Sequence, residues 1–382
     1  MESQFNFYAE KIINGQCYPA LAQYLAAPYT PEWRTFIQHY PYTTPNKLID
    51  YCAEHNFKYN INKTTPAYYI ITLGFFDFTI DYFSLIDPSI LNSHTVLFYY
   101  HEGEDPYLIK ARLDSLCVKN NIDKNCYRFI SGNKSADLLD NFAYFPDHEL
   151  LYWQQNRTTP ATAINLQPRT RDFTVLSRRH NWARAAIVAD LRRNDILENS
   201  YWSYNIIDPI VDDYQYGPIQ INRSQGHRAA VFDLIANAPF ACDHLTADAH
   251  NDHSHTVTEH YANSYCNIVL ETLYTGEPFL SEKTFKPIKH AQPFVVAAPA
   301  GTLQLLRDLG YRVFDSAIDN SYDLIADDTE RWYSLFNTVQ QIKNNPNKAE
   351  WFARLIPDLL HNQNLFAASK YNRLNNLLER IQ

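Results

Sequence analysis

The sequence predicts an α/β fold of two Rossmann-like domains that face each other across a central cleft. The chain has 382 residues, more than one hydrophobic core ordinarily serves, so two domains are expected. Several continuous apolar runs end abruptly in polar residues, which is typical of buried parallel strands. A polar segment with two prolines, residues 154–171, separates two groups of such runs and is the expected linker.

The first group of runs predicts an N-terminal domain over residues 1–160. Residues 1–65 are broken by prolines and are expected to form short helices, an N-terminal helical elaboration of the domain. The expected strands are 67–78, 94–106 and 127–133, and an amphipathic helix is expected over 107–120. A short crossover helix and turn is expected between the first two strands.

The second group predicts a C-terminal domain over residues 170–345, followed by helices over 346–382. A strand, a basic turn, a helix and a strand in succession form a βαβ unit. The elements expected along this domain are strands at 172–180, 200–207, 265–274, 293–301 and 311–314, and helices at 181–197, 281–292 and 302–310. Ser281 is the expected N-cap of the second helix, and Gly310 is expected to close the third.

Composition narrows the classes of function. The formal net charge of −9 argues mildly against a general nucleic-acid binder. This net charge is still compatible with a basic cleft on one part of the surface. No apolar run approaches a membrane span, and the N-terminal residues lack the order of a signal peptide, so a cytoplasmic protein is expected. The six cysteines form no C-x-x-C pair and are expected to be free thiols.

Glycine is scarce, which constrains any phosphate site. The chain has 9 glycines and contains neither G-x-G-x-x-G nor G-x-x-x-x-G-K-[ST], so most dehydrogenases and P-loop NTPases are excluded. There is also no G-x-S-x-G nucleophile elbow. A phosphate would therefore have to be bound by side-chain cations and helix N-termini.

Two basic segments follow predicted strands and are candidates for such a site. In SEKTFKP, Glu282, Lys283 and Lys286 lie at the start of a predicted helix, where exposed backbone N–H groups favour an anion. The segment LSRRHNWAR offers the side chains of Arg178, Arg179 and Arg184. Arginine binds phosphate oxygens in a bidentate manner. A solvated first helical turn and ordinary surface arginines are the alternative interpretations.

A third segment, HEGEDP, is acidic. Glu102, Glu104 and Asp105 follow a predicted strand, and a carboxylate there could act as general base toward an acceptor hydroxyl. An acidic turn without catalytic function is the alternative.

Metal binding is not expected to be essential. His250, Asp252, His253 and His255 could hold a divalent ion, but their spacing equally suits a polar surface loop. The pair at residues 212–213 is a second, short acidic motif.

The stretch from Tyr261 to Asp323 resembles the donor-binding domain of GT-B glycosyltransferases, most closely the α-1,3-fucosyltransferase type and related phage and bacterial glycosyltransferases. The matching positions are Glu271, Ser281, Glu282, Lys283 and the apolar run at 293–297. The resemblance implies that Lys283 binds the donor diphosphate, that Glu282 lies near the donor sugar or ribose, and that Glu271 faces the nucleotide.

The resemblance extends more weakly to the other two segments. LSRRHNWAR is similar in position to an arginine-bearing turn of the family, which implies Arg178 or Arg184 as a second diphosphate ligand. Gly103-Glu104-Asp105 is similar to a Gly-Glu-Asn segment of the acceptor domain, which implies Glu104 as the base. Asp105 in place of Asn and the additional Glu102 depart from that pattern.

The expected function is therefore a GT-B-like transfer of a sugar from a nucleoside-diphosphate sugar to an acceptor hydroxyl, with inversion implied by the resemblance and with no essential cofactor. The N-terminal domain is expected to bind the acceptor, and the C-terminal domain the nucleotide sugar. The acceptor is expected to be a glycan or a modified nucleobase. Three alternatives stay open: a phage-type enzyme that acts on a modified base in DNA, a non-catalytic nucleotide-sugar-binding protein, and a different nucleotide-handling α/β enzyme.

Overall fold

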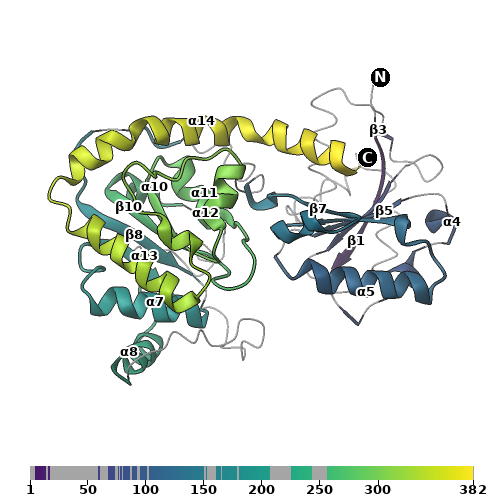
Figure 1. Cartoon of the computed structure of the whole chain (residues 1–382), viewed down its shortest axis with the longest axis horizontal. Coiled ribbons are helices and arrows are strands. Elements are labelled where there is room, and N and C mark those ends of the chain that lie inside the picture. Colours follow the sequence, from purple (N-terminus) through teal and green to yellow (C-terminus); the bar gives the residue numbers. More distant parts are fainter. Residues whose placement is uncertain are drawn as a thin grey trace. The chain divides into compact units, whose positions relative to one another are not determined.

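The computed structural model has two compact units. Unit 1 comprises Met1–Asp147 and Lys370–Gln382, and unit 2 comprises His148–Ser369. Both contain a largely parallel sheet with helices (Figure 1), so the predicted α/β class is confirmed. The structure describes residues 5–13, 16–17, 59–60, 68–73, 76, 78–79, 81–86, 88–92, 95–100, 103–149, 152, 161–164, 166–178, 180–206, 225–242 and 256–381.

Unit 1 is built on a sheet with the strand order β2-β1-β4-β5-β6-β7, and β3 pairs with β1. The pairs from β1 through β7 along this order are parallel, and β2 is antiparallel to β1. Its strands are β1 (Phe5–Ile13), β2 (Gln16–Cys17), β3 (Tyr59–Asn60), β4 (Tyr68–Leu73), β5 (Thr95–Tyr100), β6 (Tyr127–Ser131) and β7 (Phe142–Tyr144). Its helices are η1 (Phe83–Leu85), α4 (Pro88–Leu91), α5 (Pro106–Lys119), η2 (Lys124–Cys126) and η3 (Lys134–Leu138).

The core of unit 1 lies between the sheet and α5 and explains much of the aromatic content. Phe98 of β5 and Phe129 of β6 are fully buried and pack with Tyr82, Phe83 and Tyr127. Aromatic rings bury large apolar areas and favour edge-to-face contacts. These rings therefore belong to the hydrophobic core of unit 1. They hold β5 and α5, the two elements that flank the HEGEDP segment.

The N-terminal residues differ from the prediction of short helices. Residues 5–13 form β1, which pairs in parallel with β4 over Phe7–Ile12 and Tyr68–Leu73. Phenylalanine, tyrosine and isoleucine suit a pleated surface, and β4 offers a strand to pair with. Apart from β2 and β3, the remaining residues of 1–65 lie outside the described part.

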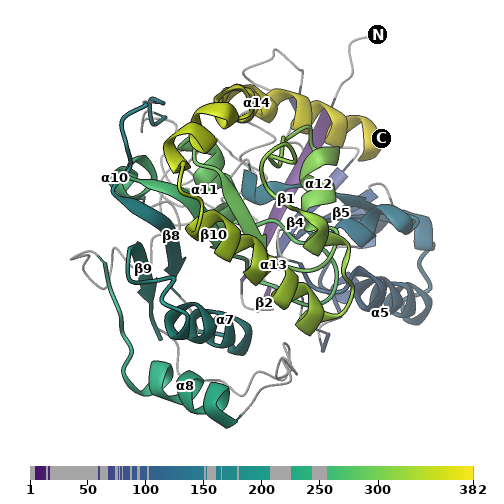
Figure 2. The same cartoon turned by 60° about the vertical axis from the view of Figure 1, so that its left-hand side comes forward.

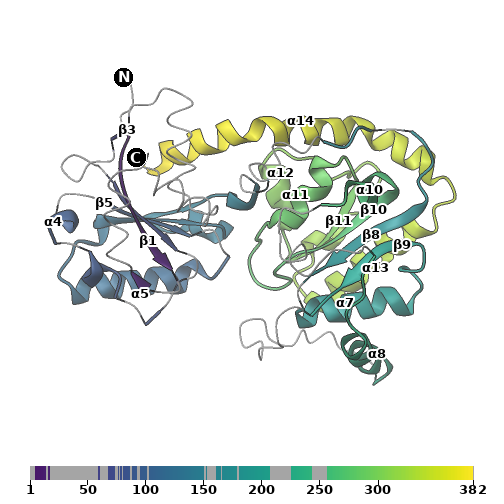
Figure 3. The ribbon, with the colours of Figure 1, turned by 180° about the vertical axis from the view of Figure 1, so that it is seen from behind.

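Unit 2 is built on an all-parallel sheet with the strand order β11-β10-β8-β9. Its strands are β8 (Arg171–Ser177), β9 (Ser200–Tyr204), β10 (Ser264–Leu270) and β11 (Phe294–Ala297). Its helices are α7 (Trp182–Arg193), α8 (Gln225–Ala236), α10 (Thr258–Ala262), α11 (Glu282–Lys289), α12 (Thr302–Asp308), η4 (Ser321–Leu324), α13 (Asp328–Lys343) and the first part of α14 (Lys348–Ile381). Helices α7 and α13 cover one face of the sheet, and α11 and α14 cover the other (Figure 3).

Three helices of unit 2 meet at a buried carboxylate. Asp190 of α7 accepts hydrogen bonds from Trp332 Nε1 of α13 and pairs with His227 Nδ1 of α8, both at 2.7 Å. Helix α8 lies along α7 on the side away from the sheet (Figure 2). A buried carboxylate needs such partners, and these contacts fix α7, whose first turn contributes to the candidate site.

The predicted strand at 311–314 is wrong. These residues form no strand, and the side chain of Asn362 on α14 pairs with the backbone of one of them, Arg312. Asn362 Oδ1 accepts from Arg312 N, and Asn362 Nδ2 donates to Arg312 O, both at 2.8 Å. A side-chain amide thereby satisfies the backbone groups that a neighbouring strand would otherwise bind.

Helix α14 contributes to both units, since its residues from Lys370 onward belong to unit 1. Within unit 1, the Arg380 guanidinium pairs with Asp137 and donates to the carbonyl oxygen of Tyr144. Among the described residues, no helix is long and apolar enough to cross a membrane.

Candidate functional site

The site in unit 2 begins where β10 ends. Glu271 follows the last residue of β10, and Ser281 is the N-cap of α11, as predicted. The Ser281 hydroxyl accepts a hydrogen bond from the backbone N–H of Lys283 at 3.3 Å. In a parallel sheet, the carboxyl ends of the strands are where ligands bind, and a helix N-terminus there presents N–H groups.

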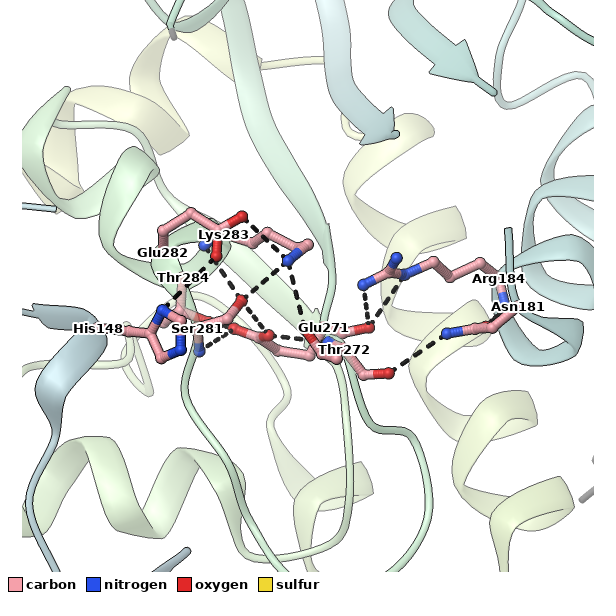
Figure 4. A network of polar contacts seen from close by, with 9 residues as sticks. All are labelled: His148, Asn181, Arg184, Glu271, Thr272, Ser281, Glu282, Lys283 and Thr284. Atoms are coloured by element: carbon pink, nitrogen blue, oxygen red, sulfur yellow. Dashed lines mark hydrogen bonds and ion pairs between the residues drawn. The ribbon is translucent and has the colours of Figure 1, made fainter. Parts of the chain in front are cut away.

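Glu271 organises this turn. It is 2% exposed, and its carboxylate accepts four hydrogen bonds. Ser281 N (3.1 Å) and Thr284 Oγ1 (2.6 Å) donate to Oε1, whereas Ser281 Oγ (2.5 Å) and Thr272 N (3.0 Å) donate to Oε2. The side chain that was predicted to face a nucleotide thus joins the end of β10 to the start of α11 (Figure 4).

Lys283 lies at the centre of the polar cluster in Figure 4. Its Nζ is 3.0 Å from Glu282 Oε1, 3.2 Å from Ser281 Oγ and 3.3 Å from Thr272 Oγ1. The Lys283 side chain is 23% exposed and that of Glu282 is 9% exposed. The structure therefore places a partly accessible cation next to two hydroxyls and a helix N-terminus.

His148 joins this cluster and was not singled out from the sequence. Its Nδ1 is 3.9 Å from Glu282 Oε2, and its ring packs edge-to-face on Phe279. Glu282 therefore faces Lys283 through one oxygen and His148 through the other. A lone histidine far along the chain gives no sequence signal of this contact.

The basic turn after β8 reaches the same place through α7. Asn181 caps α7 by accepting from Arg184 N at 2.8 Å, and its Nδ2 donates to Thr272 O at 3.3 Å. Arg184 is 5% exposed, and its Nε and Nη2 donate to Glu271 O at 3.1 and 2.9 Å. The guanidinium is thus bound to the backbone that follows β10, and Asn181 is a second residue that the sequence did not reveal.

Of the other basic candidates, the structure describes Arg178 and Lys286. Arg178 directly follows β8 and is half-buried, and Lys286 lies one turn into α11 and is half-buried. Arg179 lies outside the described residues. The roles of all these residues in binding a donor stay predictions.

Buried Arg331 holds the loops around this site. It is 2% exposed, and its guanidinium donates to the carbonyl oxygens of Ala298 after β11 and Tyr274 after β10, at 3.0 and 2.7 Å. Further bonds go to Ile325 O and Ala326 O. Charged donors form strong hydrogen bonds, so one side chain fixes the loops that follow two neighbouring strands.

Unit 1 holds the acidic candidates. Glu104 lies between β5 and α5, and its Oε2 is buried with no hydrogen-bond partner in the described part of the chain. Burial raises the pKa of Glu104, because desolvation disfavours the charged form. Asp105 has a structural role, since it caps α5 by accepting from Tyr107 N at 2.8 Å. Glu102 lies outside the described residues.

The sequence offered two segments with side chains that could hold a metal ion, although no essential metal was expected. His250, Asp252, His253, His255 and the pair at 212–213 lie outside the described residues. In the part that is described, no group of three or more His, Cys, Asp or Glu side chains is arranged to hold a metal ion.

No protein-family model matches the sequence, and neither does any curated protein. Among solved structures, the chain is similar to the DNA-modifying enzyme β-glucosyltransferase, determined in the presence and absence of uridine diphosphoglucose. The two chains are 9% identical, the alignment covers 99% of each, and the TM-score is 0.39.

Proposed function

We propose that the chain is a glycosyltransferase that moves a sugar from a nucleoside-diphosphate sugar to an acceptor hydroxyl. The observation that carries this proposal is the arrangement of Lys283 at the start of α11, with its Nζ beside the hydroxyls of Ser281 and Thr272. A partly exposed ammonium group at a helix N-terminus suits a diphosphate, which develops negative charge as the sugar departs.

Glu282 fits the sugar end of such a donor. Its carboxylate now accepts from Lys283 Nζ, and a bound diphosphate would compete for that ammonium group. The carboxylate could then accept hydrogen bonds from hydroxyls of the donor sugar or ribose. The buried frame of Glu271, Arg184 and Asn181 would hold the turn in place, as catalysis requires of groups that stabilise developing charge.

Glu104 is the proposed base. A carboxylate whose pKa is raised by burial is better matched to proton abstraction at neutral pH. Direct attack by the acceptor oxygen, with no covalent intermediate on the protein, would invert the configuration of the sugar carbon. Acceptors of two kinds fit this chemistry: a glycan hydroxyl and a hydroxyl on a modified nucleobase.

Donor binding is the first test. Purified chain is titrated with UDP, GDP, ADP and CMP while its melting temperature is followed. A ligand at 100 times its Kd stabilises the folded state by about 2.7 kcal/mol, so one nucleotide should raise the melting temperature. Lys283→Ala should abolish most of that rise. Absence of a response to every nucleotide would remove the support for a donor site.

Lys348 provides the matched control. It also belongs to unit 2, its side chain is 20% exposed, and its Nζ pairs with Asp172 Oδ1 at 3.2 Å. Lys348→Ala removes a lysine and an ion pair of the same kind but leaves the start of α11 intact. Loss of the nucleotide response in both variants would mean that general destabilisation, and not the site, explains the result.

A further inference from the structure

A buried asparagine in unit 1 joins the turn after β6 to the turn that carries Glu104. Asn133 is 3% exposed and lies two residues beyond Ser131, the last residue of β6. Its Nδ2 donates to the carbonyl oxygen of Gly103 at 3.0 Å and is 3.5 Å from the carbonyl oxygen of Glu104. Because β5 and β6 are paired in parallel, both turns follow the carboxyl edge of the sheet, where ligands bind.

The rest of Asn133 is held by β6 and η3. Its backbone N–H donates to Ser131 Oγ at 3.1 Å, and its Oδ1 accepts from Ser135 N at 3.0 Å as the N-cap of η3. Both serines are buried. The side-chain amide thus uses its oxygen within its own segment and its nitrogen for the turn after β5, so both of its polar atoms have partners.

These contacts fix the direction of the Glu104 side chain. The carbonyl oxygens of Gly103 and Glu104 belong to the two peptide groups on either side of the Glu104 α-carbon. Because each peptide group is planar, orienting both of them sets the direction in which the side chain leaves the backbone. The next residue, Asp105, begins α5 as its N-cap. Glu104 is therefore held between a buried asparagine and the start of a helix.

The Glu104 carboxyl group needs to be held in this way. Its Oε2 is buried and has no hydrogen-bond partner among the residues that the structure describes. A buried carboxylate oxygen without a partner costs free energy. If the turn after β5 could move, the carboxylate would therefore turn toward water. Burial also raises the pKa of Glu104, and this effect would be lost with such a movement.

We propose that Asn133 is a positioning residue, which holds the turn after β5 so that the Glu104 carboxylate stays in its buried place and can take the proton of an acceptor hydroxyl. This role rests on the proposed function, in which Glu104 is the general base. Asn133 would act through Glu104 alone. Its loss should therefore slow proton transfer and leave donor binding unchanged.

The first test replaces Asn133 by serine in the full chain. Serine also caps helices, so Asn133→Ser keeps an acceptor for Ser135 N and removes the donor to Gly103 O. We expect kcat to fall by about 10–100-fold, as a displacement of about 1 Å can cause, with the Kd of the nucleotide within about twofold of the wild type. Asn133→Asp, which keeps the shape and the cap but lacks the donor, should also lose turnover and replaces the serine variant if that variant folds poorly.

Asn120→Ser is the matched control. Asn120 lies at the other end of α5, and its Nδ2 donates to Asp81 Oδ1 at 3.0 Å and to Leu116 O at 2.9 Å. The control makes the same substitution in the same unit and removes a part-buried donor, but it leaves the turn after β5 intact. Its kcat should match that of the wild type. Equal losses of kcat in both variants would mean that general destabilisation of unit 1 explains the result.

The pKa of Glu104 gives a readout that does not depend on sugar transfer. It is measured by NMR in the full chain labelled with ¹³C at the glutamate carboxyl groups, and the Glu104 signal is identified by its loss in Glu104→Gln. In Asn133→Ser this pKa should fall toward the ordinary 4.5 as the carboxylate reaches water. In Asn120→Ser it should not change. A pKa that Asn133→Ser leaves unchanged would overturn the proposal, even if the wild type transferred no sugar.

A double variant separates this role from a role in stability. In the Glu104→Gln background, Asn133→Ser should lower kcat no further, because the two residues act on the same step. A further loss of the same size as in the wild type would overturn the proposal. If Glu104→Gln itself leaves kcat unchanged, the proposed base is wrong, and the NMR measurement still decides whether Asn133 holds the carboxylate in place.

Discussion

The hydroxyl oxygen of Ser281 lies 2.5 Å from Oε2 of Glu271. The same oxygen is 3.3 Å from the backbone nitrogen of Lys283 and 3.2 Å from its Nζ. Ser281 thus donates to a buried carboxylate while it caps α11. One small side chain therefore sets both the start of the helix and the place of the cation that we assign to the donor.

Replacing Ser281 by alanine should weaken both the fold and donor binding. The variant loses the N-cap and leaves Glu271 with one donor fewer, which should lower the free energy of unfolding by about 1–2 kcal/mol in urea titrations. The Kd of the nucleotide identified by the thermal screen should rise about tenfold or more, a loss of roughly 1.4 kcal/mol of binding free energy.

Asp327→Ala is the control for that prediction. Asp327 caps α13 by accepting from Thr329 N and Glu330 N. Its loss should cost a similar amount of stability and leave the Kd unchanged. If both variants weaken nucleotide binding equally, Ser281 acts only through general stability.

Glu104→Gln should stabilise the protein and reduce its activity. Burial raises the pKa of Glu104 above its ordinary 4.5. The folded chain therefore holds the proton more tightly than the unfolded chain. Ionisation of Glu104 therefore lowers the free energy of unfolding. This loss is absent below the pKa that Glu104 has in the unfolded chain and complete above the pKa that it has in the folded chain. The glutamine variant should thus unfold at higher urea concentration than the wild type at neutral pH, with the difference fading in acid.

Glu104→Gln also tests whether Glu104 is the general base. Loss of a general base should lower kcat by about 10²–10⁴-fold while donor affinity is retained. Asp105→Asn is the control, since asparagine also caps helices and Asp105 is exposed. Unchanged turnover in Glu104→Gln would exclude Glu104 as the base, and loss of turnover in Asp105→Asn would point to the segment's shape instead.

Lys289 should make stability depend on alkaline pH. It lies in the last turn of α11, is 6% exposed, and burial lowers its pKa to about 8 from 10.5. The unfolded chain binds this proton more tightly, so stability should rise between pH 8 and 10.5, by no more than about 3 kcal/mol. In Lys289→Met that part of the rise should disappear. Identical pH slopes for the two chains would contradict the assignment.

Metal removal should leave donor binding and transfer largely unchanged. We expect turnover with and without EDTA to agree within about twofold, because the proposed site neutralises the diphosphate with Lys283 and the N–H groups of α11. Restoration of activity by Mg²⁺ or Mn²⁺ after chelation would instead place a metal at the donor. Turnover of the enzyme in saturating Mg²⁺ is the reference value for both measurements.

Local patterns were sufficient to predict the elements that frame the proposed donor site. The apolar runs that became β8, β10 and β11 are buried on both faces, so they read as continuous hydrophobic segments. Ser281 was recognisable as an N-cap because capping depends on residues adjacent in sequence. The basic side chains after β8 and β10 could also be identified as candidates, because they follow the strands directly in the sequence.

Long-range pairing explains what the sequence could not reveal. At 311–314, where a strand was expected, the backbone of Arg312 pairs instead with the side chain of Asn362, 50 residues further along the chain. His148 meets Glu282 across more than a hundred residues. The sequence also did not reveal that Arg184 donates to the carbonyl oxygen of Glu271 and that the Glu271 carboxylate accepts from Ser281, because these contacts depend on how α7, β10 and α11 pack.

The two-segment make-up of unit 1 has a consequence for synthesis on the ribosome. Arg380 bonds to the carbonyl oxygen of Tyr144, 236 residues earlier. At about 5–20 residues per second, roughly ten to fifty seconds pass before that arginine is made. Tyr144 and Asp137 therefore leave the ribosome long before Arg380 does, and their contacts with Arg380 form only after all of unit 2 has been translated.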